Sequence, residues 1–355
     1  MQDIKINKTT ALKIKPFDKE GFKVGKYFTD HMFVMDYEAN HGWYNPRIIP
    51  YSPISLDPSA MCLHYGQISF EDIKAFRSEN GDILLFRPDL SLASLNKSSK
   101  RILIPDIDEK FCLEAIKKLV SIERAWISKE KGSFLYLRPF IFANECSLDV
   151  NSSSSFTFVI ICSPVSSTYK EALKPMDVLV QNKISRAING GLGGSKTAGN
   201  YISTIMARNF ARENSCDEVI WVDGVDKRYI EEMGNMNVFF AIDDEIVTPE
   251  VDEMVFDGVM RASAVELLEA WGYKVSSRKV TISEIEYAYS EGRLKEVFAV
   301  GDNDTVSSIA SIKINAKVMT INGGEVGKIA RRLNNNITGI QCGDIRDIMG
   351  WTIRV

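Results

Sequence analysis

The sequence predicts an α+β protein of two domains. Its 355 residues correspond to two domains at a typical ~150 residues each. Strand-like runs dominate the first half, whereas strands alternate with helical patterns in the second. Apolar residues make up 45% and charged residues 25%, and no unbroken apolar stretch approaches the roughly 20 residues of a membrane-spanning helix. These features exclude a disordered chain and a membrane-inserted one.

The first half of the chain predicts an antiparallel α+β domain over residues 1–162. A single helix is expected at 107–127, where apolar side chains such as Phe111, Ile116 and Leu119 recur at helical spacing. Short runs rich in β-branched and aromatic residues predict strands at 27–37, 82–88, 133–143 and 156–165.

A linker and a larger second domain follow. The segment 163–176 contains prolines and serines with no sustained period, so we predict an interdomain linker there. The polar run at 151–155 is followed directly by an apolar strand and indicates a turn instead. The second domain is expected over 177–355, with strands at 218–224 and 237–243 and helices at 201–213 and 259–272.

Charge and cysteine usage limit the partners and the location. The 43 Lys+Arg against 47 Asp+Glu give a net charge of −4 without a basic cluster, which argues against nucleic acid as a partner. The chain starts with charged residues where a signal peptide needs an apolar core, so the cytoplasm is expected. Six cysteines form no C-x-x-C pair and are expected to be reduced thiols, mostly in the core: Cys62, Cys112, Cys146, Cys162, Cys216 and Cys342.

The segment INGGLGGSKTAGNY at 188–201 is the most unusual part of the sequence. Five glycines and a lysine lead into an amphipathic helix, a pattern typical of tight backbone near a ligand or of a flexible loop. It differs from a phosphate-binding P-loop, because that consensus requires glycine immediately before the lysine and Ser195 stands there. An NTPase is therefore not expected.

Lys196 in this segment is a candidate nucleophile. Burial that lowers the pKa of its amine would leave it neutral and able to form a Schiff base with a carbonyl. The alternative is an ordinary solvated loop lysine.

Two further elements could carry chemistry. Tyr136 and Arg138 lie two residues apart on a predicted strand and therefore on one face, where a phenol beside an arginine suits a carboxylate. A surface ion pair would look identical. The three histidines, His31, His41 and His64, are too far apart and lack cysteine companions, so no metal site is expected.

The order of these pieces resembles the branched-chain amino-acid aminotransferases, which are fold-type IV enzymes that use pyridoxal 5′-phosphate (PLP). The resemblance runs along nearly the whole chain, and its blocks occur in the family's order. It implies a smaller N-terminal α/β domain, a larger C-terminal domain and a cofactor at their interface. The matching blocks include YFTDHMF at 27–33, LHYGQISFEDIKAFR at 63–77, YLRPFIFANECSLDV at 136–150, KISRAINGGLGGSKTAGNY at 183–201, EEMGNMNVFF at 231–240 and GIQCGDIRDIMGWTIRV at 339–355.

The resemblance also implies which residues hold the cofactor. Lys196 of KTAGNY would form the Schiff base with PLP and then move the substrate's α-proton. Glu232, rather than its neighbour Glu231, would face the pyridine nitrogen and keep it protonated. The remaining implied cofactor contacts are the Tyr201 phenol, the Arg87 guanidinium on the phosphate, the backbone amides of Val259 and Met260 at a helix start, and the turn residues Gly301 and Asp302.

The substrate side is implied in the same way. Tyr65, Tyr136 and Arg138 would hold the substrate carboxylate, whereas Phe28 and Phe70 would contact a branched aliphatic side chain, although ordinary core packing is the alternative for the aromatic residues. Asn235 and Asn303 match further substrate-side positions. The family's members are dimers, and a loop with Leu148 and Val150 would close the partner subunit's pocket.

Several positions depart from the family pattern. The family's G-T-G-T-A turn reads Ala299, Val300, Gly301, Asp302, Asn303, which places a negative charge where a threonine contacts the phosphate. Two like charges ~4 Å apart repel by about 1 kcal/mol in water and about 4 at an effective dielectric near 20. Other positions also differ from the family residues: Asp72 for glycine, Asn235 for threonine, Asp257 for proline and Cys342 for tyrosine.

The sequence therefore predicts a PLP-dependent aminotransferase that moves an amino group from a branched-chain-like L-amino acid to a 2-oxo acid. The departures leave two alternatives open: a divergent PLP transaminase or lyase of specialised metabolism with a more polar substrate, or a degenerate PLP-binding relative.

Overall fold

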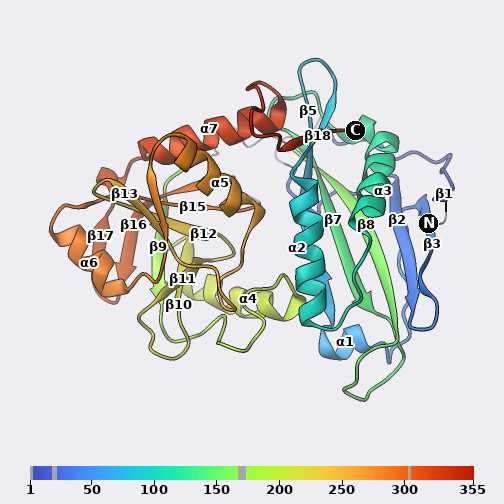
Figure 1. Ribbon diagram of the computed structural model, residues 1–355, viewed down its shortest axis with the longest axis horizontal. Coiled ribbons are helices and arrows are strands. Elements are labelled where there is room, and N and C mark those ends of the chain that lie inside the picture. Colours follow the sequence, from blue (N-terminus) through green and yellow to red (C-terminus); the bar gives the residue numbers. More distant parts are fainter. Residues whose placement is uncertain (1–2, 18–21, 167–172, 303–304) are drawn as a thin grey trace. The chain divides into compact units, whose positions relative to one another are not determined.

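The structure is a computed structural model that describes residues 3–17, 22–166, 173–302 and 305–355. The chain forms two compact units, each described here by itself: unit 1 comprises Met1–Tyr169, Lys196–Ala198 and Gly339–Val355, and unit 2 comprises Lys170–Ser195 and Gly199–Thr338. The domain limits expected from the sequence, 1–162 and 177–355, stay a prediction. The two units differ from them because Lys196–Ala198 and Gly339–Val355 belong to unit 1. Figure 1 shows the elements of both units.

Unit 1 is built on one large sheet with helices on it. Its strands are β1 (Lys5–Ile6), β2 (His31–Glu38), β3 (Gly42–Pro50), β4 (Ile68–Phe70), β5 (Ile73–Arg77), β6 (Ile83–Phe86), β7 (Phe134–Ala143), β8 (Ser155–Val165) and β18 (Thr352–Arg354). The strand order is β1-β3-β2-β8-β7-β5-β6-β18, with β4 paired to β7. All pairs are antiparallel except β1 with β3.

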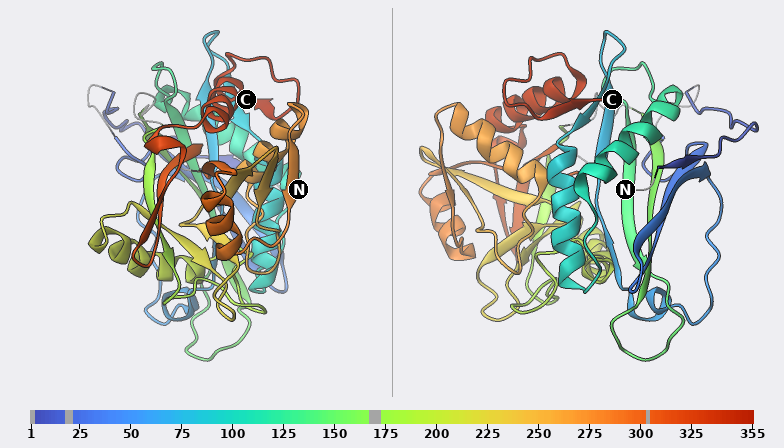
Figure 2. Two further views of the ribbon diagram at one scale, coloured as in Figure 1. Left: turned by 90° about the vertical axis from the view of Figure 1, so that its left-hand side faces the viewer. Right: turned by 45° about the vertical axis from the view of Figure 1, so that its right-hand side comes forward.

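Two helices of unit 1, α2 (Pro88–Arg101) and α3 (Glu109–Ile122), cover the same face of this sheet (Figures 1 and 2). The sequence predicted α3. The Asp108 side chain caps α3 by accepting a hydrogen bond from the Phe111 amide, and the 3-10 helix η1 (Arg124–Trp126) follows it. The prediction of a single helix between the strands was wrong, because the structure also has α1 (Met61–Tyr65) and α2 (Pro88–Arg101). α2 carries many serines and lysines, and its apolar pattern is therefore weak.

Unit 2 contains the second sheet. Its strands are β9 (Met176–Gln181), β10 (Glu218–Val222), β11 (Ile230–Met233), β12 (Asn237–Ile242), β13 (Glu245–Thr248), β14 (Lys274–Ser277), β15 (Leu294–Val300), β16 (Val306–Ile314) and β17 (Lys317–Thr320). The strand order is β11-β10-β9-β16-β15-β12-β13-β14, with β17 paired to β16. The pairing is mixed, since β9 is parallel to both β10 and β16, whereas β12 is antiparallel to β13 and β15.

The helices of unit 2 are α4 (Ala198–Glu213), α5 (Val259–Ala270), α6 (Ile282–Ser290), the 3-10 helix η2 (Asn322–Gly324) and α7 (Lys328–Cys342). Ala198 of α4 and the end of α7 from Gly339 belong to unit 1. α4 packs Ala207 and Ala211 against buried strand residues such as Trp221, and the predicted helices at 201–213 and 259–272 are confirmed. The Thr281 side chain caps α6 by accepting from the Glu284 amide.

Two composition-based expectations can be compared with the structure. Among the described residues, no helix combines the length and the apolar character needed to cross a bilayer. All six cysteines are free; five are buried and Cys146 is exposed, which agrees with the prediction of reduced thiols mostly in the core.

Candidate active site

The backbone of Lys196 is fixed by unit 1. The Phe70 amide donates to the Lys196 carbonyl at 3.1 Å, and the Lys196 amide donates to Ser98 Oγ at 2.9 Å. Thr197 forms a bridge with Ser69 beside β4. The Lys196 side chain is only 5% exposed, so the alternative of a solvated loop lysine is wrong.

The Lys196 amine lies among four polar side chains of unit 1. Lys196 Nζ is 2.7 Å from Asp72 Oδ2 and 3.0 Å from Glu71 Oε2. The other oxygen of Asp72, Oδ1, is 2.9 Å from an Arg138 guanidinium nitrogen and accepts a hydrogen bond from the Tyr136 hydroxyl. We call Glu71, Asp72, Tyr136, Arg138 and Lys196 the lysine cluster. Tyr136 and Arg138 share one face of β7, as the two-residue spacing predicted.

The neighbouring cations keep Asp72 of the lysine cluster ionised. Burial raises the pKa of Asp72, but the nearby charges of Lys196 and Arg138 outweigh it and lower that pKa to about 2, so Asp72 is ionised at neutral pH. Burial and the Asp72 charge raise the pKa of the Tyr136 phenol, which therefore keeps its proton and donates it. The expectation of a neutral Lys196 amine rested on burial alone, and the structure adds two carboxylates, Asp72 and Glu71, within 3.0 Å of Nζ.

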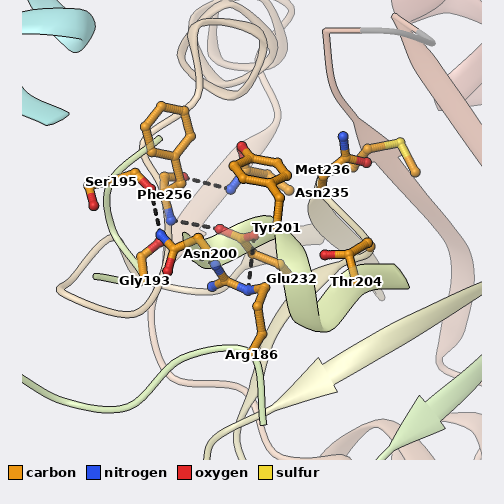
Figure 3. Close-up of a pocket in the computed structure, with 12 residues that line it drawn as sticks. Arg186, Gly193, Ser195, Asn200, Tyr201, Thr204, Glu232, Asn235, Met236 and Phe256 are labelled. Carbon is orange, nitrogen blue, oxygen red and sulfur yellow. Dashed lines mark hydrogen bonds and ion pairs between the residues drawn. The ribbon is translucent and has the colours of Figure 1, made fainter. Parts of the chain in front are cut away.

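Unit 2 contains a small pocket with polar and apolar lining residues, which we call the Glu232 pocket. Figure 3 shows Tyr201 and Glu232 among the side chains that line it, with a dashed line joining Arg186 to the Glu232 carboxylate. The pocket is lined by Arg186, Gly193, Ser195, Asn200, Tyr201, Thr204, Glu232, Gly234, Asn235, Met236, Asn237 and Phe256. Three predicted site residues, Tyr201, Glu232 and Asn235, are thus brought together.

Glu232 is buried and held on two sides. Its Oε1 accepts a hydrogen bond from the Phe256 amide at 2.7 Å, and its Oε2 is 3.5 Å from Arg186 Nε. Burial raises the pKa of Glu232, while the Arg186 charge and the Phe256 amide oppose that rise. Sequence reasoning missed Arg186. Arg186 lies in the block KISRAI that precedes the glycines, and its position there is the only feature of the sequence that could have indicated a role.

The neighbouring carboxylate, Glu231, shares the same arginine at a greater distance. An Arg186 guanidinium nitrogen is 4.0 Å from Glu231 Oε2, and neither Glu231 oxygen has a hydrogen-bond partner among the described residues. Burial raises the pKa of Glu231 to about 8, with Arg186 opposing and the Glu232 charge adding to the rise. Glu231 therefore carries its proton at neutral pH.

The raised pKa of Glu231 gives a prediction for stability against pH. The folded protein holds the Glu231 proton from pH 4.5, the ordinary pKa, up to about 8, whereas the unfolded chain releases it. The contribution of Glu231 to the free energy of unfolding is therefore complete below pH 4.5. It decreases as the pH rises from 4.5 to about 8, by at most about 1.4 kcal/mol per pH unit. Urea unfolding of the Glu231→Gln variant across these pH values should show a shallower loss than the parent. Parallel curves for the two proteins would contradict this account of Glu231.

Glycines allow close backbone packing around the pocket. A Cβ on Gly193 would lie 2.4 Å from the Ala187 Cβ and 2.9 Å from the Met254 Cα, so glycine is required there. A Cβ on Gly258 would lie 2.8 Å from Asn237 Oδ1. Gly258 is the extended N-cap of α5, and the amides of the next residues, Val259 and Met260, open the helix. A helix start of this kind favours an anion such as a phosphate.

Arg87 lies at the junction of β6 and α2 in unit 1. Its backbone is left-handed, with φ 43° and ψ 47°, a conformation that costs energy for a residue with a side chain. Its amide donates to the Trp351 carbonyl at 2.7 Å, and its guanidinium lies 5.0 Å from the centre of the Trp351 ring. β18, which follows Trp351, pairs with β6 and so holds this strained junction in place.

The aromatic site residues of unit 1 are placed as follows. The Phe70 ring lies 4.4 Å from the Arg138 guanidinium and so borders the lysine cluster. Phe28 stacks on Tyr51 with ring centres 5.0 Å apart. Tyr65 is 42% exposed and donates to the Leu148 carbonyl. Leu148 and Val150 are 63% and 81% exposed on the loop after β7.

The turn that departs from the family pattern follows β15. Gly301 is tightly packed, since a Cβ there would lie 2.6 Å from Met236 Cγ. Asp302 is half-buried. Asn303 lies outside the described residues. Asn235 lines the pocket and accepts a hydrogen bond from Arg208 at 3.3 Å.

Comparisons with known proteins support one family. The family described as amino-transferase class IV matches residues 70–312, more than half of the chain. Branched-chain-amino-acid aminotransferase 2 of Bacillus subtilis (strain 168) is 46% identical over 354 residues, covering 100% of this chain and 97% of that one. The chain belongs to the class IV aminotransferases. Branched-chain-amino-acid transaminase 1 of the same strain is 44% identical over 353 residues, covering 99% of each chain.

Solved structures show that the aminotransferase has the fold of its family. The Escherichia coli branched-chain amino acid aminotransferase superposes with a TM-score of 0.75 at 22% identity, covering 91% of this chain and 98% of that one. A second branched-chain amino acid aminotransferase, solved in complex with N-(5′-phosphopyridoxyl)-L-glutamate, gives a TM-score of 0.72 at 22% identity, covering 90% and 97%. The predicted α+β, fold-type IV architecture is therefore confirmed. Class IV aminotransferases use PLP, so the chain is a PLP-dependent transaminase.

The residues of the aminotransferase fit this cofactor chemically. The Glu232 pocket offers a buried carboxylate for a protonated ring nitrogen and a phenol, Tyr201, for a ring oxygen. A phosphate suits both the opening amides of α5 and the Arg87 guanidinium. The buried Lys196 amine is a primary amine of the kind that an aldehyde can bond.

Proposed function

We propose that this aminotransferase transfers the amino group of a branched-chain L-amino acid to a 2-oxo acid. The main support is the full-length sequence identity of 46% and 44% to two Bacillus subtilis proteins with that activity in their names. The lysine cluster and the Glu232 pocket supply groups that suit this reaction. The alternatives of a lyase or a degenerate relative are not favoured.

Each cofactor-side residue has a role in this proposal. Bound PLP supplies a ring that withdraws electrons from the substrate's α-carbon. Lys196 bonds the cofactor and then moves the proton at that carbon. Glu232, oriented by the Phe256 amide and Arg186, holds the ring nitrogen in its protonated form. Tyr201 holds the ring oxygen.

The phosphate and the substrate are assigned to other side chains. Arg87, the Val259 and Met260 amides and the turn at Gly301 and Asp302 hold the phosphate. Arg138, Tyr136 and Tyr65 bind the substrate carboxylate, with the polar groups of Asn235 and Asn303 also on the substrate side. Phe70 and Phe28 form the apolar surface for a branched aliphatic side chain, which agrees with the position of the Phe70 ring beside Arg138.

We also propose a cytoplasmic homodimer. Large apolar side chains are exposed on the loop after β7, at Leu148 and Val150, which would reach a partner subunit's pocket. On α4, Ile202, Ile205 and Met206 are 67%, 64% and 62% exposed at helical spacing, as expected for a face that a partner covers. Sedimentation of the purified protein at twice the 39.9 kDa chain mass would support the dimer.

An amino-donor panel tests the proposed substrate. Protein saturated with PLP is mixed with leucine, isoleucine, valine and a set of polar donors, and the visible absorbance of the bound cofactor is followed without an acceptor. We expect the three branched donors to bleach the band fastest, and 2-oxoglutarate to restore it. Bleaching by polar donors alone would contradict the branched-chain assignment, and the absence of any band with excess PLP would contradict the cofactor.

A further inference from the structure

The Asp72 carboxylate is bound by Tyr136 and Arg138, two side chains of the lysine cluster that suit a carboxylate. Its Oδ1 accepts a hydrogen bond from the Tyr136 hydroxyl and lies 2.9 Å from the Arg138 guanidinium, while its Oδ2 lies 2.7 Å from Lys196 Nζ. Arg138 Nε also donates to the Tyr136 oxygen at 2.8 Å, which locks the phenol and the guanidinium together. A phenol and an arginine presented in this way form a carboxylate site, and the structure shows a carboxylate in it.

This carboxylate is part of the chain itself. Asp72 lies between β4 and β5, one residue after Glu71, at a position where the family pattern has glycine. With glycine at this position, the Tyr136 hydroxyl and the Arg138 guanidinium would lose the carboxylate oxygen that they now contact, and the carboxylate of an incoming ligand could take its place.

We propose that Asp72 is a specificity-determining residue, a built-in carboxylate that competes with the substrate carboxylate for Tyr136 and Arg138. Amino acids and 2-oxo acids then bind only when they displace the Asp72 side chain from these two groups. The inference deepens the proposed function and rests on it, because it takes the same two side chains as the substrate's carboxylate anchor.

The local structure determines how strongly Asp72 competes. The Asp72 side chain is 9% exposed and that of Arg138 is 34% exposed, so the pair is partly screened and remains open to an incoming ligand. Asp72 Oδ1 cannot share its place with a second oxygen, because Tyr136 has one proton to donate. Asp72 therefore weakens every carboxylate ligand, whatever its side chain, while leaving the contact surface of the aliphatic group intact.

The test compares Asp72→Gly and Asp72→Asn with the parent holoenzyme. The probe is the anion of 4-methylvaleric acid, a branched carboxylate without an amino group, and its binding is measured by calorimetry. We expect Asp72→Gly to bind the probe at least about tenfold more tightly, ~1.4 kcal/mol, and Asp72→Asn to shift in the same direction. The KM for leucine and for 2-oxoglutarate should fall with the dissociation constant of the probe, with a smaller change in kcat.

A matched control removes another aspartate–arginine pair. Asp36 lies 2.5 Å from Arg47 between β2 and β3 of the same unit, and both side chains are 24% exposed. Asp36→Asn should leave the dissociation constant of the probe and both KM values unchanged. A shift in Asp36→Asn equal to that in Asp72→Asn would overturn the proposal, since general loss of an ion pair would then explain it.

Other outcomes separate this inference from the proposed function. Unchanged or weaker probe binding in both folded Asp72 variants overturns the inference, even where the parent transfers amino groups normally. Tighter binding in Asp72→Gly supports it, even where branched-chain donors prove poor and the proposed donor fails. Because Asp72→Asn preserves the shape of the side chain, it provides the answer where Asp72→Gly does not fold.

Discussion

Replacing Lys196 with methionine should abolish the visible PLP band and lower kcat for transamination by at least about a thousandfold. The estimate follows from two losses, the covalent bond to the cofactor and a proton-transfer group that alone contributes about 10²–10⁴-fold. The change also leaves Glu71 and Asp72 buried without their shared amine, so lower stability is expected as well. Stopped-flow absorbance with leucine and a thermal unfolding scan measure the two effects.

Two variants separate chemistry from folding at this position. Lys196→Arg keeps a cation for both carboxylates but cannot bond the aldehyde, so it should fold and remain inactive. Lys313→Met removes a partly buried lysine of β16 that donates to the Asn214 carbonyl at 3.3 Å, and it should keep the band and the rate. An active Lys196→Arg variant with a normal visible band would contradict the role of Lys196.

Replacing Glu232 with glutamine should lower kcat by about a hundredfold or more, the typical effect of losing a charge-stabilising group in a closed site. The amide keeps the size of the side chain and its contact with the Phe256 amide, but it cannot hold a protonated ring nitrogen. The decrease should appear in the half-reaction with leucine alone, measured by the rate of bleaching, whereas the affinity for PLP should change less.

Glu231→Gln is the matched control for this prediction. Glu231 shares Arg186 with Glu232 but carries a proton at neutral pH, so a neutral amide should leave the rate near that of the parent. Equal rate losses in the two variants would contradict the specific role assigned to Glu232.

The sequence predicted the fold well where it has strong periodicity or matching blocks. The long strands β7 and β8, the helix α3 and the strand–helix alternation of the second half all have clear apolar patterns. The Tyr136–Arg138 face followed from strand geometry alone. The glycine-rich segment left tight backbone or a flexible loop open, and the structure shows tight packing at Gly193 and Gly194, where a Cβ does not fit.

Other features depend on contacts between distant residues. α2 carries few apolar residues and forms because Leu92 and Leu95 pack into the core of the sheet. β18 joins β6 across more than two hundred residues of chain, and no local pattern indicates that pairing. Asp72 was noted only as a departure from glycine, since its contacts with Lys196 and Arg138 require β5, β7 and the 196–198 segment to come together. Arg186 was missed for the same reason.

The central claim is that the Lys196 amine bonds the PLP aldehyde. The direct measurement is borohydride reduction of the holoenzyme, digestion with trypsin and mass spectrometry of the peptides. The peptide between Arg186 and Arg208, which contains Lys196 as its only lysine, should carry the phosphopyridoxyl mass and resist cleavage at that lysine. A phosphopyridoxyl group found on a different lysine, with this peptide unmodified, would contradict the account.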